Sequence, residues 1–193
     1  MTTQLQDAYI VAATRSPIGK SGRGMFRNTR PDDLLVGVLK SALAQVPNLD
    51  PKLIEDAIVG CSFPEGAQGL NLARMSVLLA GLPNTIGGVT INRYCASGIT
   101  AVAMAADRIR VGQADVMIAA GVESMSMVPM MGNNPSMNMA ILKDENAGIA
   151  YGMGLTAEAV AKKFNISREA ADAFSVRSHQ RAAAARISGP SAR

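Results

Sequence analysis

Two thiols, Cys61 and Cys95, are the strongest nucleophiles in this chain of 193 residues. Cys95 follows the extended run GVTINRY and precedes a long apolar helical pattern, so it lies where a strand gives way to a helix. A helix N-terminus stabilises a thiolate through its dipole and its free N–H groups, and those N–H groups can also hold the oxyanion formed when sulfur attacks a carbonyl. Small residues follow at 96–98 and let backbone and substrate approach closely. Position alone fits a nucleophile and a small core cysteine about equally well.

The remaining candidates for chemistry are weaker. Cys61 lies in the apolar run AIVGCSF, so we expect it in the core. The single histidine, His179, stands among polar residues of an expected helix, which favours a solvated side chain over a catalytic base. The cysteines form no CxxC pair, although one disulfide between them is formally possible. No metal cluster, dinucleotide fingerprint or phosphate-binding loop is recognisable, so the sequence predicts neither a metal nor a bound cofactor.

The elements that position Cys95 alternate between strands and helices. Pro31 suits a first helical position, and two aspartates after it suit the positive end of the helix dipole. The run at 116–122 is continuously apolar and is expected to be an interior strand, while the helix at 96–111 is apolar nearly all round and is expected to be buried. Apolar strands alternating with helices predict a layered α/β domain over residues 1–126, with the sheet covered on both faces. The expected strands are 9–13, 57–63, 88–94 and 116–122, and the expected helices are 31–46, 70–80 and 96–111.

The sequence changes character after the first domain. Residues 127–154 are rich in Met, Pro, Gly and Asn, which is typical of a long excursion that is either functional or disordered. Helical patterns return at 155–164 and 167–186, so residues 127–186 form a second region. Residues 187–193 read as a tail of Gly, Pro and Ser without a pattern.

Composition bounds the function. The net charge of +4 is spread along the chain, aromatic residues make up only 4%, and Trp is absent, all of which argue against nucleic-acid binding. The N-terminus has neither a basic segment followed by a long apolar run nor an apolar stretch of membrane-spanning length, so we expect no membrane partner. We expect a soluble protein of a reducing, cytoplasmic compartment.

Four segments resemble those of the thiolase family and occur in the family's order. The segment around Cys95, 91–102, resembles the acyl-enzyme signature, and 121–126 (GVESMS) resembles the end of a family strand. The turn at 14–20 is similar to the family's R-[ST]-P-x-G-K, and 153–158 is similar to its MGxTAE segment. Four motifs in register are far more specific than one. The resemblance implies a thiolase-like layered α/β/α domain with a mixed, largely buried sheet, followed by part of a loop domain.

The resemblance also implies a chemistry. Thiolases move acyl groups between coenzyme A thioesters, either in the thiolytic cleavage of fatty acid β-oxidation or, in the reverse direction, in the Claisen condensation of acetyl-CoA. Cys95 would carry the acyl group in a ping-pong reaction, with its own N–H as one of two oxyanion donors. Met153 matches a residue that lines the acyl pocket, although ordinary loop packing explains it equally well. The implied partners are acyl-CoA and CoA as substrates, and a second copy of the chain, since thiolases are homodimers or homotetramers.

The family's second half is missing from the pattern. It supplies a GHP histidine, a CxGxG cysteine and an Asn-Glu-Ala-Phe segment, and none of these occurs here. Removing an activating base costs a factor of roughly 10²–10⁴ and removing an oxyanion donor roughly 10²–10³, so we expect the N-terminal half alone to be inactive in turnover. Gly152 stands where biosynthetic members often carry histidine, which favours a broad 3-ketoacyl-CoA thiolase. A biosynthetic acetyl-CoA acetyltransferase and a non-catalytic remnant stay open, whereas GVESMS and MGLTAE disfavour a ketoacyl synthase.

Overall fold

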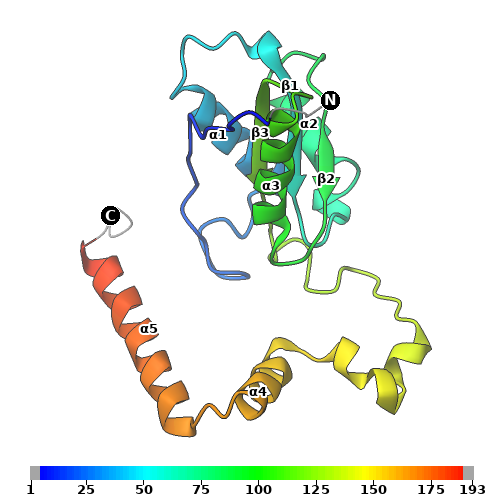
Figure 1. Cartoon of the computed structure of the whole chain (residues 1–193), viewed down its shortest axis with the longest axis vertical. Coiled ribbons are helices and arrows are strands. Elements are labelled where there is room, and N and C mark those ends of the chain that lie inside the picture. Colours follow the sequence, from blue (N-terminus) through cyan, green and yellow to red (C-terminus); the bar gives the residue numbers. More distant parts are fainter. Residues whose placement is uncertain (1–4, 189–193) are drawn as a thin grey trace. The chain divides into compact units, whose positions relative to one another are not determined.

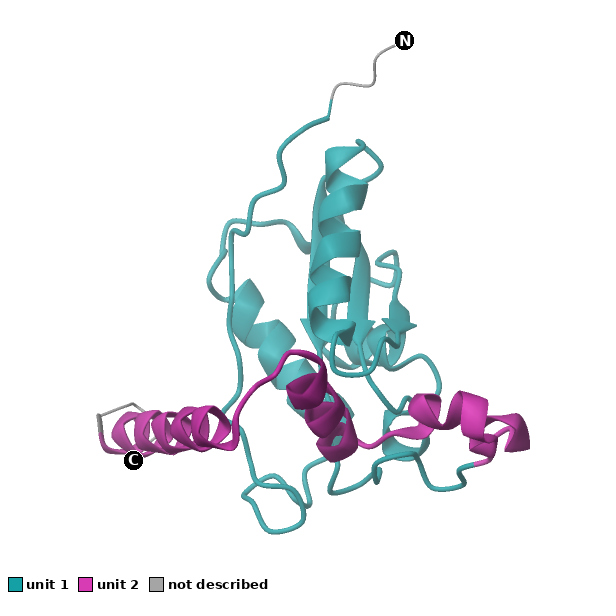
Figure 2. Ribbon diagram, turned by 60° about the horizontal axis from the view of Figure 1, so that its bottom comes forward, with its two compact units in different colours: residues 1–135 teal, residues 136–193 magenta. Residues whose placement is uncertain are grey.

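The computed structural model describes residues 5–188, which fall into two compact units (Figure 2). The first unit runs from Met1 to Pro135 and the second from Ser136 to Arg193. The sequence predicts a domain boundary near residue 126, whereas the first unit of the structure continues to Pro135. Val128 is fully buried there, and the side-chain amide of Asn133 donates to Glu65 Oε1 over 2.7 Å.

The first unit is built on a parallel sheet of three strands in the order β2-β1-β3 (Figure 1). The central strand is β1 (Ile54–Gly60), flanked by β2 (Val89–Ile91) and β3 (Val116–Gly121). Gly60 pairs with both Ile91 and Gly121, so the three strands end at the same level. All described pairs are parallel, where a mixed sheet was expected. Strand β3 lies at the edge of the sheet that the described residues form, so the prediction that 116–122 is an interior strand is wrong. An apolar run indicates that both faces of a strand are covered and carries no information about its neighbours within the sheet.

Helices cover both faces of this sheet, as predicted for a layered α/β domain. Helices α1 (Pro31–Leu43) and α2 (Leu72–Leu79) pack on one face, and α3 (Ser97–Arg110) packs on the other (Figure 1). Successive side chains of a strand point to opposite faces. Val59 of β1 therefore packs with Leu35 and Leu72, while the neighbouring Ile58 packs with Ala101 and Ala105.

Local signals explain where α1 and α2 begin. Pro31 occupies the first turn of α1, and Asp32 follows it near the positive end of the helix dipole. The Arg30 guanidinium bonds to the Asp32 carboxylate and holds its pKa below the usual value. Asn71 caps α2 by accepting from Arg74 N–H. Short 3₁₀ turns precede β1 and α2, at Pro51–Leu53 and Gly66–Gln68.

Helix α3 is not buried all round, contrary to the prediction. Its buried positions are Ser97, Ala101 and Ala105, one stripe at a spacing of four residues. Ile99, on another side of the helix, is 71% exposed. The helix packs on the sheet with this stripe, and Ile99, Val102 and Met104 on its other faces are exposed.

The strand predicted at 9–13 is also absent from the structure. Residues 5–20 have no regular secondary structure, and Ile10 is 79% exposed. The side-chain amide of Gln45 pairs with both Ala13 N–H and Ala13 C=O, in the way that a neighbouring strand would. An apolar run becomes a strand only when another strand is present to pair with it, so the local pattern was insufficient.

The second unit consists of short 3₁₀ turns followed by two helices. The turns are η3 (Met139–Leu142) and η4 (Asp144–Ala150), and the helices α4 (Met153–Lys163) and α5 (Arg168–Ser188) fall where the sequence predicts them. Residues 187 and 188 of the expected tail belong to α5, and 189–193 lie outside the described residues. No helix among the described residues has the length and apolar character needed to cross a membrane.

Candidate functional site

Cys95 lies in the connection between β2 and α3, as predicted, and its side chain is exposed. The residue before it, Tyr94, has a φ of 46°, in the left-handed region that residues with a side chain rarely adopt. Such a conformation is costly and persists only where the surrounding structure enforces it. The connection is therefore a sharp turn that lifts a thiol into solvent at the start of a helix.

Hydrogen bonds within the turn hold Tyr94 in this conformation. Tyr94 N–H donates to Asn92 Oδ1 over 2.8 Å, and Tyr94 C=O accepts from Ser97 Oγ over 2.6 Å and from Ser97 N–H over 3.0 Å. Ser97 Oγ also accepts from Arg93 N–H over 2.8 Å. Ala96 N–H donates to Arg93 C=O. The N–H groups of Ala96 and Ser97 are thus engaged within the turn.

Gly60, the last residue of β1, lets the sheet approach this turn closely. A Cβ at Gly60 would lie 2.5 Å from the Ser97 carbonyl carbon and 2.7 Å from Gly98 N. Both of these atoms are backbone, so no side chain can rotate away to make room. At Gly121, in the neighbouring strand, an added Cβ would be 3.5 Å from its nearest atom. Gly60 therefore sets the distance between the sheet and the first turn of α3.

A hydrogen-bonded network of polar groups joins the ends of β1 and β3. Ser62 N–H, just after β1, donates to Glu123 Oε2 over 2.7 Å, and Gln68 Nε2 donates to Glu123 Oε1 over 2.7 Å. Gln68 is fully buried, and its side-chain oxygen accepts from Ser124 N–H. The other bond of its amide nitrogen goes to Phe63 C=O. These bonds fix the carboxyl ends of both strands, which is where α/β proteins usually bind their ligands.

Cys61 is a core residue, as predicted. Its side chain is 1% exposed and packs with Leu35, Val59 and Leu72. Burial raises the pKa of the Cys61 thiol to about 12, and the nearby Glu123 carboxylate, 3.9 Å from the sulfur, acts in the same direction. Both cysteines are free thiols. The two thiols therefore differ sharply, since only Cys95 is accessible to a reagent or substrate.

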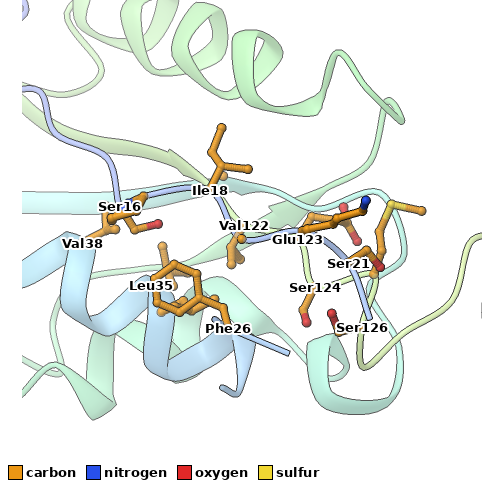
Figure 3. A pocket seen from close by; sticks show the side chains of 16 residues that line it. Ser16, Ile18, Ser21, Phe26, Leu35, Val38, Val122, Glu123, Ser124 and Ser126 are labelled. Atoms are coloured by element: carbon orange, nitrogen blue, oxygen red, sulfur yellow. The ribbon is translucent and has the colours of Figure 1, made fainter. Parts of the chain in front are cut away.

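A cavity of about 350 Å³ lies beside β3 and is lined by residues of two of the quoted motifs, the turn at 14–20 and the segment 121–126 (Figure 3). Residues 16–21 of the N-terminal turn line one side of it, and residues 121–126, which begin at the last residue of β3, line the other. Leu35 and Val38 of α1 contribute an apolar wall. Gly22 N–H also donates to Ser126 Oγ over 2.9 Å, which ties the two segments. Segments a hundred residues apart thus become neighbours through the fold.

The other candidates lie in the second unit. Met153 is the first residue of α4 and is 72% exposed. His179 lies on α5 and is exposed, as expected of a solvated histidine. All side chains that the structure describes on α5 are exposed. Within residues 5–188 no group of three or more His, Cys, Asp or Glu side chains is placed to hold a metal ion.

Sequence reasoning missed the residues that support Cys95. The apolar strand pattern around Gly60 does not predict its close contact with Ser97, and it does not predict the hydrogen bonds of Gln68 and Glu123. One signal was present for Asn92, because an Asn two residues before a turn residue is typical of a turn closed by its side chain. The contacts of Gly60, Gln68 and Glu123 join residues far apart in the chain, and no local pattern announces them.

The fold and the turn together define a layered α/β domain with an exposed thiol between a strand and a helix. Comparison with known families assigns it further. Residues 8–190 match the model of "Thiolase, N-terminal domain". The chain belongs to the thiolase family and corresponds to its N-terminal domain.

Individual relatives agree with this assignment. The chain is 47% identical over 186 residues to the 3-ketoacyl-CoA thiolase of Bacillus subtilis and 44% identical over 189 residues to that of Colwellia psychrerythraea. Both alignments include 96% of this chain and 47% of the relative, so the chain spans about half the length of these proteins. It also resembles the crystal structure of the Bacillus anthracis acetyl-CoA acetyltransferase, with a TM-score of 0.79 and 34% identity over 97% of this chain and 49% of that one.

Proposed function

We propose that this chain carries the acyl-accepting part of a thiolase active site, with Cys95 as the nucleophile. The observation that carries the proposal is the exposed Cys95 on its strained turn, in a chain of the thiolase family. The second thiol is excluded from this role by its burial and by its raised pKa. The substrates are coenzyme A thioesters, and no bound cofactor is needed.

The proposed reaction forms and breaks bonds in a balanced way. In the degradative direction, the Cys95 thiolate attacks the 3-keto carbon of a 3-ketoacyl-CoA. The bond between the second and third acyl carbons then breaks, and the leaving carbon takes a proton to give acetyl-CoA. A second coenzyme A thiol attacks the acyl-Cys95 thioester, and the Cys95 sulfur leaves. The Cys95 N–H would stabilise the oxyanion, and Met153 would line the acyl pocket.

The direction and chain length are inferred from two observations. The relatives at 44–47% identity are named 3-ketoacyl-CoA thiolases, whereas the acetyl-CoA acetyltransferase structure is 34% identical. Gly152, before Met153, stands where biosynthetic thiolases often carry histidine. Both favour a broad 3-ketoacyl-CoA thiolase over a biosynthetic acetyl-CoA acetyltransferase. Similar acylation of Cys95 by acetyl-CoA and hexanoyl-CoA would support the broad specificity, and acylation by acetyl-CoA alone would support the biosynthetic alternative.

We infer that the 193-residue chain alone is acylated without turning over. Its single histidine, His179, is an exposed residue of the polar helix α5, and the family's GHP histidine motif does not occur in the sequence. The loss of a general base and of one oxyanion donor costs factors of roughly 10²–10⁴ and 10²–10³. Turnover would then require the remaining catalytic groups of a full-length thiolase and assembly into the homodimer or homotetramer of the family. Thiolysis by the purified chain at the rate of a whole enzyme would refute this inference.

The decisive experiment is intact-mass spectrometry after incubation with acetyl-CoA. We expect one acetyl adduct on the wild-type chain, none on Cys95→Ala, and one on the matched variant Cys61→Ala. The acetyl group moves from coenzyme A to Sγ, and coenzyme A leaves with the proton that the Cys95 thiol gave up. If iodoacetamide alkylates Cys95 but acetyl-CoA leaves it unmodified, the chain is a non-catalytic thiolase remnant.

A further inference from the structure

Asn92 lies between β2 and Cys95, and its side chain bonds in two directions. Its Nδ2 donates to the carbonyl of Ser62, after β1, over 2.8 Å. Its Oδ1 accepts from the N–H of Tyr94 over 2.8 Å. One amide therefore joins the nucleophile turn to the end of the central strand.

Ser62, which accepts from this amide, is itself held by a hydrogen bond to the network after β1 and β3. Its N–H donates to Glu123, and Glu123 in turn accepts from the fully buried Gln68. A continuous chain of hydrogen bonds thus runs from the residues after β3, through those after β1, to the turn after β2. Side-chain networks of this kind rigidify the groups that they connect.

The bond to Tyr94 acts at the most constrained point of the turn. Tyr94 has a φ of 46°, which a residue with a side chain keeps only under external restraint. If the Asn92 acceptor were removed, Tyr94 could return to an extended conformation, and the direction of the following Cys95 side chain would change. Asn92 itself is exposed, so its removal opens no cavity in the core. Its loss should affect the placement of Cys95 more than the folding of the domain.

We propose that Asn92 is a positioning residue that sets the orientation of Cys95 by tying the Tyr94 turn to Ser62. The inference rests on the proposed function of Cys95 as an acyl acceptor. Acyl transfer requires the sulfur, the thioester carbonyl and the oxyanion donor to be aligned, whereas alkylation by a small reagent has no such requirement. Asn92 should therefore matter for acetylation and matter little for alkylation.

The test compares Asn92→Ala, Asn92→Ser and the control Asn48→Ala in the full chain. Asn48 is exposed in a turn far along the sequence from Cys95 and makes no side-chain hydrogen bond within the described residues. A serine hydroxyl can still accept from the N–H two residues on, so it keeps the local turn in part. For each variant the rates of Cys95 acetylation by acetyl-CoA and of Cys95 and Cys61 alkylation by iodoacetamide are measured. Amide hydrogen exchange is followed over residues 93–95.

We expect acetylation of Asn92→Ala to fall about tenfold or more, with Asn92→Ser intermediate and Asn48→Ala unchanged. Cys95 alkylation should change less than about threefold, and Cys61 should stay protected, which shows that the core is intact. Exchange at Tyr94 should accelerate about tenfold in Asn92→Ala. Acetylation of folded Asn92→Ala at the wild-type rate would overturn the inference. If Asn92→Ala exposes Cys61, the same comparison is decided on Asn92→Ser.

The outcome also separates this inference from the proposed function. If acetyl-CoA leaves the wild-type chain unmodified, the proposed function fails for this chain. The positioning inference is then decided by hydrogen exchange alone. Faster exchange at Tyr94 in Asn92→Ala supports it, and exchange identical in wild type and variant overturns it.

Discussion

Replacing Gly60 by alanine is expected to misplace Cys95. The added Cβ would lie 2.5 Å from the Ser97 carbonyl carbon, whereas ordinary van der Waals contact begins at 3.4 Å. The first turn of α3 must then move by about 0.9 Å, the difference between these two distances. A displacement of roughly 1 Å in an active site can cost a factor of about 10² in rate, and overpacking typically costs about 1–3 kcal/mol of stability.

The assay follows Cys95 acetylation by acetyl-CoA together with unfolding in urea. Two glycine-to-alanine variants serve as controls. Gly121→Ala lies at the end of the neighbouring strand, but its Cβ meets its nearest atom at 3.5 Å, so acetylation should stay within about threefold of wild type. Gly37→Ala lies on an exposed side of α1 with no atom within 4 Å, so the helix should be stabilised by up to about 1 kcal/mol.

The result that refutes this reasoning is specific. If Gly60→Ala is acetylated as fast as Gly121→Ala, the close contact between β1 and α3 does not position the nucleophile. A loss of stability without a loss of acetylation would lead to the same conclusion. If the wild-type chain is not acetylated, the prediction is tested by urea unfolding alone. Gly60→Ala should then be the least stable of the three variants.

Three further predictions concern the core and its two thiols. Iodoacetamide near pH 8 should alkylate Cys95 and spare Cys61, which is 1% exposed with a pKa raised to about 12; equal labelling in intact-mass spectra would contradict this. The folded state keeps Cys61 protonated above its ordinary pKa of 9.0, so the free energy of unfolding should fall between about pH 9 and pH 12, by at most about 4 kcal/mol. Urea unfolding near pH 8 and pH 10.5 should show a smaller decrease for Cys61→Ala, and parallel decreases would rule the mechanism out. Leu35→Ala should lower the free energy of unfolding by about 2–5 kcal/mol, against less than about 0.5 kcal/mol for the exposed Leu53→Ala; equal values in urea would show that Leu35 is not a core residue.

Local sequence signals predicted the helices and the position of Cys95. Pro31 with its following aspartates marks the start of α1, and the change from an extended run to a helical pattern places Cys95 between β2 and α3. The four quoted motifs identified the family, which the match over residues 8–190 confirms. These features were readable because each depends on residues close together in the chain.

The strand content was harder to read from the same patterns. Residues 9–13 have strand composition but pair with no strand, and β3 lies at the edge of the described sheet despite its continuous apolar run. Whether an apolar segment becomes a strand, and where it lies in a sheet, depends on the partners that the fold supplies. Periodicity alone carries no information about those partners.

The sequence by itself determined the family, the place of Cys95 between a strand and a helix, and the order of the helices. Only the tertiary structure decided how Cys95 is held, because that depends on contacts between distant segments. Gly60 meets the backbone of Ser97, and Asn92 reaches Ser62, which Glu123 anchors from the end of β3. The parallel register brings the ends of all three strands to one level, and this shared edge places those residues around the turn.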